Sequence, residues 1–261
     1  MSDEALPVLM YHSVPAQGPG GVLAVPVGRV REQWQALADG GWELMGLTAG
    51  FVAKAADPDR KIVCLTFDDA LQDFEAVPEL LAERGAGATL YVPTAHVGCD
   101  AEQLGYDPGT RLLDWDALAA LPDSVEIGSH GHRHLPQDLL TSEALADELA
   151  RSRHLLAERT GRQAMSFCYP HGYASARTAT TVRGAGFANA CVIGHRLGRS
   201  VSDDRWRFPR MHVLAQHRGA DVVRMAHHGV DGLRPRLVAA AQPPWRVVRR
   251  AAHRTTGVVW T

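Results

Sequence analysis

Short apolar segments alternate along this chain with longer segments of helical periodicity. The apolar segments are a few residues long, rich in β-branched and aromatic side chains and nearly free of charge, as buried parallel strands are. We expect strands at Pro7–Val14, Ile62–Phe67, Ala88–Val92, Val125–Ser129, Ser166–Tyr169, Asn189–Ile193 and Phe208–Val213. We expect helices at Val27–Gly40, Phe74–Arg84, Trp115–Leu121, Ser142–Thr160 and Tyr173–Ala185. Such a βα repeat predicts an α/β barrel or a doubly wound sheet.

Residues at the helix ends agree with this pattern. Thr141 or Ser142 can accept a hydrogen bond from the first turn of the helix that follows, as N-cap residues do. Gly161 and Gly186 come directly after two of the predicted helices, where glycine commonly ends a helix.

Length and composition favour one large globular domain. The chain has 261 residues, of which 46% are hydrophobic and 21% charged. The formal net charge is −2, and the sequence pI is about 6.7. A protein with no overall basic field is not expected to bind nucleic acid.

The sequence predicts a cytoplasmic location. No uncharged stretch offers the 18 or more consecutive apolar residues that a membrane span needs. The first residues, Met1 to Glu4, are acidic where a secretory signal would be basic.

Cysteine spacing argues against a zinc knuckle or a thioredoxin-type redox site. The four cysteines are widely separated and form no C-x-x-C pair. We expect them to be buried, reduced thiols. They are Cys64, Cys99, Cys168 and Cys191.

Polar residues cluster at the carboxyl ends of four predicted strands, which is where the active sites of α/β folds lie. The apolar pattern of the strands does not explain these residues. The clusters are Tyr11-His12-Ser13, Thr66-Phe67-Asp68-Asp69, Ser129-His130-Gly131-His132-Arg133-His134 and Tyr169-Pro170-His171-Gly172.

Two of these clusters predict a metal site. Asp68 and Asp69 directly follow a buried strand, where two carboxylates are costly unless cations or hydrogen-bond donors meet them. Alternatively, one aspartate caps the next segment and the other is solvated. His130 and His134 are four residues apart, which places both imidazoles on one face of a helical turn or tight loop. Imidazole with carboxylate is a common set of zinc ligands.

His132 permits a second interpretation of the histidine cluster. The spacing of His130, His132 and His134 also matches the paired-histidine strand of amidohydrolase-type barrels. Those enzymes usually carry the pair on their first strand and often use a carbamylated lysine, whereas this cluster is mid-chain and neither Lys54 nor Lys61 is near the carboxyl end of a predicted strand. We therefore favour the four-residue helical spacing, with His132 facing away.

The ordered motifs resemble those of a known family. Thr66-Phe67-Asp68-Asp69, His130-x-x-x-His134 and Phe167-Cys168-Tyr169-Pro170-His171-Gly172 look like the first three motifs of the polysaccharide deacetylases, the NodB-homology domain of carbohydrate esterase family four. Leu9-Met10-Tyr11-His12 and Phe208-Pro209-Arg210 resemble the circularly permuted branch that includes the poly-N-acetylglucosamine deacetylases. The resemblance spans about residues 6 to 215 and implies a distorted (β/α) barrel.

The resemblance also implies a role for each motif residue. Asp69, His130 and His134 would bind a divalent metal, most favourably zinc, with cobalt, manganese and nickel as alternatives. Asp68 would be the general base, and His12 the general acid that protonates the departing amine. A backbone N–H after Tyr169, that of His171, would help to hold the oxyanion.

Two positions depart from the family pattern. Ala70 stands where a glycine usually follows the two aspartates, which matters if that position needs a positive φ. Cys168 stands where many members carry an arginine that orients the base. As in the permuted branch, Arg210 is expected to serve instead.

The C-terminal residues differ in character from the rest. We assign residues 1–232 to the catalytic domain and residues 233–261 to a basic extension. This extension has several arginines, interleaved apolar residues and no Asp or Glu. It is expected either to contact an anionic membrane surface peripherally or to form a surface extension.

These features predict a metal-dependent hydrolase that removes N-acetyl groups from an N-acetylated sugar or glycoconjugate. Because both proton-transfer candidates, Asp68 and His12, are present, an enzyme is favoured over a weakly active metal-binding or glycan-binding relative. A hydrolase of a small non-sugar amide or formamide is the alternative among enzymes.

Overall fold

The strands of the main sheet form a closed parallel barrel in the computed structural model, which describes residues 5–17, 21–200 and 203–230. The strands follow the order β2 (Val8–Tyr11), β10 (Phe208–His212), β8 (Asn189–Ile193), β7 (Ser166–Cys168), β6 (Val125–Ser129), β5 (Ala88–Val92) and β4 (Ile62–Phe67). Because β2 pairs with both β10 and β4, the sheet closes. The predicted α/β barrel is confirmed, and the open doubly wound sheet is not formed.

Short additional strands distort the barrel. The strand β3 (Glu43–Met45) pairs with the first half of β4, and β5 pairs only with the end of β4. The strands β1 (Ala5–Leu6) and β9 (Gly198–Arg199) form a separate antiparallel pair.

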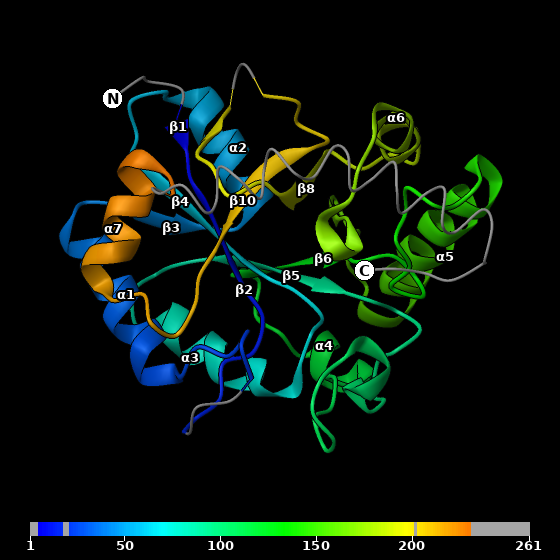
Figure 1. Cartoon of the computed structure of the whole chain (residues 1–261), viewed down its shortest axis with the longest axis horizontal. Helices are drawn as coiled ribbons and strands as arrows, with labels where there is room; N and C mark the ends of the chain where they lie inside the picture. Colours follow the sequence, from blue (N-terminus) through cyan, green and yellow to red (C-terminus); the bar gives the residue numbers. More distant parts are fainter. Residues whose placement is uncertain (1–4, 18–20, 201–202, 231–261) are drawn as a thin grey trace.

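Helices surround the strands, as Figure 1 shows. The helices α1 and α7, which are far apart in the sequence, pack against each other. The α-helices are α1 (Val27–Asp39), α2 (Leu47–Ala56), α3 (Val77–Ala82), α4 (Trp115–Ala119), α5 (Ser142–Thr160), α6 (Ala176–Gly184) and α7 (Gly219–His228), and the 3-10 helices are η1 (Gln72–Ala76), η2 (Ala101–Leu104) and η3 (Pro170–Gly172).

Most predicted elements are present, and two predicted helices need correction. The strands β4, β5, β6 and β8 agree with the prediction residue for residue. The helix expected at Phe74–Arg84 consists of η1 followed by α3. The helix expected at Tyr173–Ala185 is the shorter helix α6, which starts at Ala176 because the Ser175 hydroxyl accepts a hydrogen bond from the Thr178 N–H and caps the helix there.

The long helix α5 confirms its predicted ends. Thr141, rather than Ser142, is the N-cap, and its Oγ1 accepts a hydrogen bond of 3.2 Å from the Ala144 N–H. Gly161 follows the helix with a φ of 70°, a left-handed conformation that glycine adopts without strain.

The helix α2 was not predicted because it lacks an amphipathic pattern. Its sequence is apolar on nearly every side, and Leu47 and Phe51 are buried. Gly50 allows this helix to lie close to β4, since a Cβ there would be 2.3 Å from the Cys64 Sγ. The strand β3 and the helix α7 were also not predicted.

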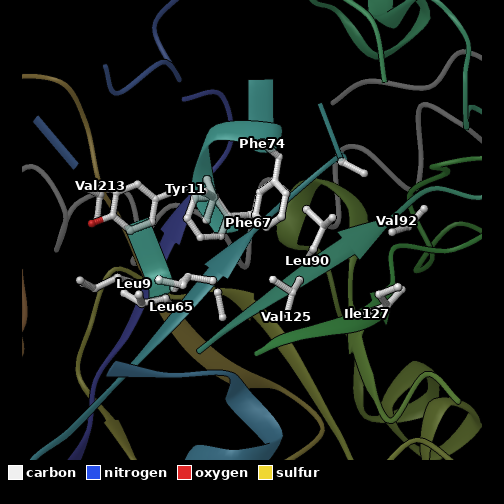
Figure 2. Packing of buried hydrophobic residues seen from close by; sticks show 14 of the residues in the cluster. Leu9, Tyr11, Leu65, Phe67, Phe74, Leu90, Val92, Val125, Ile127 and Val213 are labelled. Carbon is white, nitrogen blue, oxygen red and sulfur yellow. The ribbon is translucent and has the colours of Figure 1, made fainter. Parts of the chain in front are cut away.

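The core has two layers because successive strand residues point to opposite sides of the barrel. Leu9, Leu65 and Phe67 belong to the larger cluster, which also contains residues of the surrounding helices. Figure 2 shows Tyr11, Phe67 and Phe74 of this cluster close together. Val8 and Cys64 alternate with these residues and belong to the second cluster, inside the barrel.

This alternation positions the polar strand-end residues. Asp68 continues the inward-facing series of Cys64 and Thr66 on β4, and Arg210 follows Phe208 in the same way on β10. Polar side chains therefore gather at the carboxyl end of the barrel interior.

The cysteines agree with expectation in three of four positions. Cys64, Cys168 and Cys191 are buried and free. Cys99 is free but exposed, because it lies in the loop after β5 rather than on a strand. The prediction that all four are buried is therefore wrong for Cys99.

Among the described residues, no helix is long and apolar enough to cross a membrane. The basic extension at residues 233–261 lies outside the described residues, so its predicted membrane contact stays a prediction.

Candidate metal and catalytic site

A cavity of about 750 Å³ opens at the carboxyl ends of the barrel strands. All but one of the predicted site residues line it, namely His12, Asp68, Asp69, His130, His134, Tyr169 and His171. The remaining one, Arg210, is buried behind the cavity, with 1% of its surface exposed. The strand-end clusters that the sequence singled out therefore meet in one place.

Asp69, His130 and His134 form a compact group of potential metal ligands. Their ligand atoms lie within 4.8 Å of one another. Asp69 Oδ1 is 3.4 Å from His130 Nε2 and 3.2 Å from His134 Nε2. This oxygen is buried and accepts no hydrogen bond, as expected of a carboxylate oxygen that ligates a cation. The donor set therefore fits a divalent metal such as zinc.

Hydrogen bonds orient two of these ligands. His130 Nδ1 donates to the Cys168 carbonyl at 2.8 Å, which leaves the Nε2 lone pair directed at Asp69. The Tyr106 hydroxyl donates to Asp69 Oδ2 at 2.6 Å. Outer contacts of this kind fix the tautomer and orientation of metal ligands.

Burial and charge act differently on the three ligands. Burial lowers the pKa of His130 to about 4, so its imidazole is neutral and can donate a lone pair. Burial alone would lower the pKa of His134, but the Asp69 carboxylate raises it above its usual value. Burial alone would raise the pKa of Asp69, but the His134 and His130 imidazoles hold it well below its usual range.

The backbone that presents the ligands is a tight loop, not the helical turn that we favoured. His134 has a φ of 56° and Gly131 one of 77°, which a right-handed helix does not contain. Asp69 and Ala70 also have positive φ values, of 71° and 53°. His132 faces away, as expected, with its Nδ1 3.0 Å from Thr94 Oγ1.

Asp68 is held by Arg210 in a buried, bidentate ion pair. Arg210 Nη1 donates to Asp68 Oδ1 at 2.6 Å, and Nη2 donates to Oδ2 at 2.7 Å. Burial alone would raise the pKa of Asp68, but the guanidinium lowers it to about 2. His12 Nε2 is 3.8 Å from Asp68 Oδ2. An ionised carboxylate and an imidazole therefore lie together beside the candidate metal ligands.

Comparison with protein families now identifies the chain. A family model described as polysaccharide deacetylase matches residues 55–190. The chain belongs to the polysaccharide deacetylase family. Membership indicates a hydrolase that deacetylates carbohydrate, and deacetylases of this kind are generally metal-dependent.

Solved structures of deacetylases share the fold. The deacetylase PplD of Streptococcus pyogenes, in complex with acetate, has a TM-score of 0.72 and 18% identity over 84% of this chain and 97% of that chain. IcaB from Ammonifex degensii has a TM-score of 0.72 and 21% identity over 85% and 97%. The de-N-acetylase of Aggregatibacter actinomycetemcomitans has a TM-score of 0.69 and 15% identity over 84% and 99%. The comparison with curated proteins found no match.

A second group of side chains in this family member does not suit a metal. Asp68, His130 and Cys168 also offer ligand atoms close together. However, Arg210 bonds both oxygens of Asp68, and its Nη2 is 2.9 Å from Cys168 Sγ. Burial also raises the pKa of the Cys168 thiol well above its usual range, which disfavours the thiolate. The guanidinium thus already supplies the positive charge at this position.

The predicted oxyanion residues lie beside the candidate metal ligands. The His171 ring centroid is 4.8 Å from that of His134, and His171 has a φ of 58°. The Tyr169 hydroxyl donates to the Trp206 carbonyl at 2.9 Å, which anchors the segment in front of His171.

His212 and Tyr106 also line the cavity but were not predicted from the sequence. His212 lines it with its ring centroid 5.2 Å from that of His12, and burial lowers the pKa of His212 to about 3. The i, i+2 spacing of Arg210 and His212 at a strand end could have revealed it. Tyr106 carried no such signal, because it lies in the long loop after β5.

Removing one partner of the buried Arg210–Asp68 pair is expected to be strongly destabilising. Replacing Arg210 with Met would leave a buried carboxylate unpaired, which costs about 3–5 kcal/mol of unfolding free energy. Chemical denaturation of both proteins measures the difference. Arg60→Met is the control, since Arg60 pairs with Glu43 at the exposed surface and its loss should change stability little. Equal losses in the two variants would contradict a special contribution of the buried pair.

Proposed function

We propose that this chain is a metal-dependent hydrolase that removes N-acetyl groups from an N-acetylated sugar or glycoconjugate. The observation that carries the proposal is the convergence of two units in one cavity. The first unit is the ligand group Asp69, His130 and His134, and the second is the Asp68 carboxylate with the neighbouring His12.

Asp69, His130 and His134 are the residues that would hold the metal. A divalent cation, most favourably zinc with cobalt, manganese or nickel as alternatives, would polarise the acetyl carbonyl and make water a better nucleophile. Hydrogen bonds from His130 to the Cys168 carbonyl and from Tyr106 to Asp69 orient these two side chains.

Asp68 is proposed as the general base that takes the proton of the attacking water. Its low pKa keeps it ionised, and the bidentate contact with Arg210 fixes its orientation. Arg210 is therefore a positioning residue. A carboxylate with so low a pKa is a weak base in isolation. A bound metal would lower the pKa of the attacking water and so reduce the difference between the two pKa values.

His12 is proposed as the general acid that protonates the departing amine. Its imidazole lies next to Asp68, so one proton can be accepted and another delivered within the same cavity. The backbone N–H of His171, after Tyr169, is proposed to donate to the oxyanion of the tetrahedral intermediate. The presence of both proton-transfer groups supports catalysis over simple binding.

Acetate release tests the proposed function. The protein loaded with zinc, and separately with cobalt, manganese or nickel, is incubated with chitooligomers, nucleotide sugars and lipid-linked N-acetylated sugars. We expect metal-dependent acetate release from at least one of these substrates, and its loss after chelation. Metal binding without acetate release would indicate a binding relative, whereas formate release from small formamides alone would support the non-sugar hydrolase.

A cytoplasmic location and membrane contact through residues 233–261 remain proposals from sequence. Among the substrates above, a preference for the lipid-linked sugar would support the membrane contact.

A further inference from the structure

We infer that Tyr106 is a positioning residue that fixes Asp69 as a metal ligand. The inference rests on the proposed function and extends it to a residue outside the family motifs. Tyr106 donates its hydroxyl hydrogen to Asp69 Oδ2 at 2.6 Å. The other oxygen, Oδ1, faces the Nε2 atoms of His130 and His134 and accepts no hydrogen bond.

The two oxygens of Asp69 therefore have separate tasks. A carboxylate rotates easily about its last side-chain bond, since this torsion has broad, two-fold minima. A donor on Oδ2 removes that freedom and leaves Oδ1 directed at the two imidazoles. Without the hydroxyl, the carboxylate would have to be ordered by the metal itself, and binding would be weaker.

The loop that carries Tyr106 also supports the backbone of Asp69. Ala70, next to Asp69, is a second non-glycine residue with positive φ, and its carbonyl accepts a hydrogen bond of 2.9 Å from the Leu113 N–H. Two residues later, the Gln72 N–H donates to the Arg111 carbonyl at 2.8 Å. The strained turn is thus fastened to the same loop that provides the hydroxyl.

Internal contacts give this loop a defined shape. The Arg111 guanidinium donates to Asp100 at 2.8 Å and to the Gly98 carbonyl at 2.6 Å. Leu71, Ala101 and Leu112 form a small buried cluster, against which Tyr106 packs. Tyr106 therefore contacts Asp69 from a loop whose own hydrogen bonds and packing fix its conformation, as a preorganised contact requires.

Metal affinity of the Tyr106→Phe variant tests the inference. The aromatic ring and its packing are retained, and only the hydroxyl is lost. The dissociation constants for Zn²⁺ and Co²⁺ are measured on metal-free protein by competition with a chelator, and the absorption of bound Co²⁺ reports on ligand geometry. We expect affinity about 10- to 100-fold weaker than that of the unmodified protein, as for other outer contacts of metal ligands.

Tyr11→Phe is the matched control. Its hydroxyl is also buried, but it contacts Gln33 and Trp34 on the helix side of the barrel. Metal affinity should be unchanged in this variant.

Three outcomes separate the inference from the proposed function. Unchanged metal affinity and Co²⁺ absorption in Tyr106→Phe, with tight binding by the unmodified protein, overturn the inference alone. An equal loss in both variants assigns the effect to general stability and also overturns it. Failure of the unmodified protein to bind zinc, cobalt, manganese or nickel overturns the proposed function, and the inference with it.

Discussion

Replacing Asp68 with Asn is expected to lower turnover by at least about a hundredfold, the typical contribution of a general acid–base residue. The amide has nearly the shape of the carboxylate but cannot accept a proton from water. The proposed metal ligands Asp69, His130 and His134 are unchanged, so metal content should stay close to that of the unmodified protein. Acetate release at saturating metal, with metal analysis of the same samples, measures both effects.

His12→Ala should behave in the same way, because it removes the proposed proton donor and no metal ligand. Thermal unfolding of both variants shows whether either loss comes from the fold, which is necessary since Asn at position 68 weakens the buried contact with Arg210. Near-normal turnover of Asp68→Asn at saturating metal would remove the base from the proposed mechanism.

Replacing His134 with Ala is expected to remove most of the metal affinity. A site that keeps only Asp69 and His130 is half built, and loss of outer contacts alone weakens metal sites by about 10–100-fold. The loss of a direct ligand should therefore exceed about a hundredfold. Competition with a chelator, as for Tyr106→Phe, measures it.

His132→Ala provides the control within the same loop. The His132 imidazole contacts Thr94 instead of the ligand group, so its removal should leave the affinity for Zn²⁺ unchanged. Full metal retention by His134→Ala would contradict the assignment of His134 as a metal ligand. A loss in His132→Ala equal to that in His134→Ala would show that the loop, and not the imidazole, determines binding.

The barrel strands were predictable because their sequences are locally distinctive. Ile62–Phe67 and Ala88–Val92 are short, mostly apolar and bounded by turn residues, and both were placed without error. By contrast, α2 is apolar around its whole circumference, so no periodicity separates its buried face from its exposed one. Its position depends on the close approach of Gly50 to Cys64, which is a tertiary contact.

Some residues of the candidate site were likewise predictable from the sequence, and others were not. His12, Asp68 and His130 follow buried strands, and their chemistry conflicts with the apolar pattern, so they could be found from sequence. The Arg210 contact with Asp68 was expected only from the resemblance, and the structure places these two side chains together. Tyr106 was not predictable, because its place beside Asp69 depends on how a long loop folds back along the chain.

Several residues with left-handed backbone around the cavity lower the stability of the fold, but most of them carry side chains that the proposed reaction uses. Asp69, Ala70, His134 and His171 all have φ values between 53° and 71°. Such a conformation costs about 1 kcal/mol or more at each residue that is not glycine. Selection for heat resistance alone would therefore favour glycine at these four positions. At Asp69, His134 and His171, however, glycine would remove a side chain that the proposed reaction needs or contacts. Ala70 is the exception, because Ala70→Gly would keep every side chain that is proposed to act in the reaction. This substitution is therefore the first one to make when a more heat-stable variant is wanted.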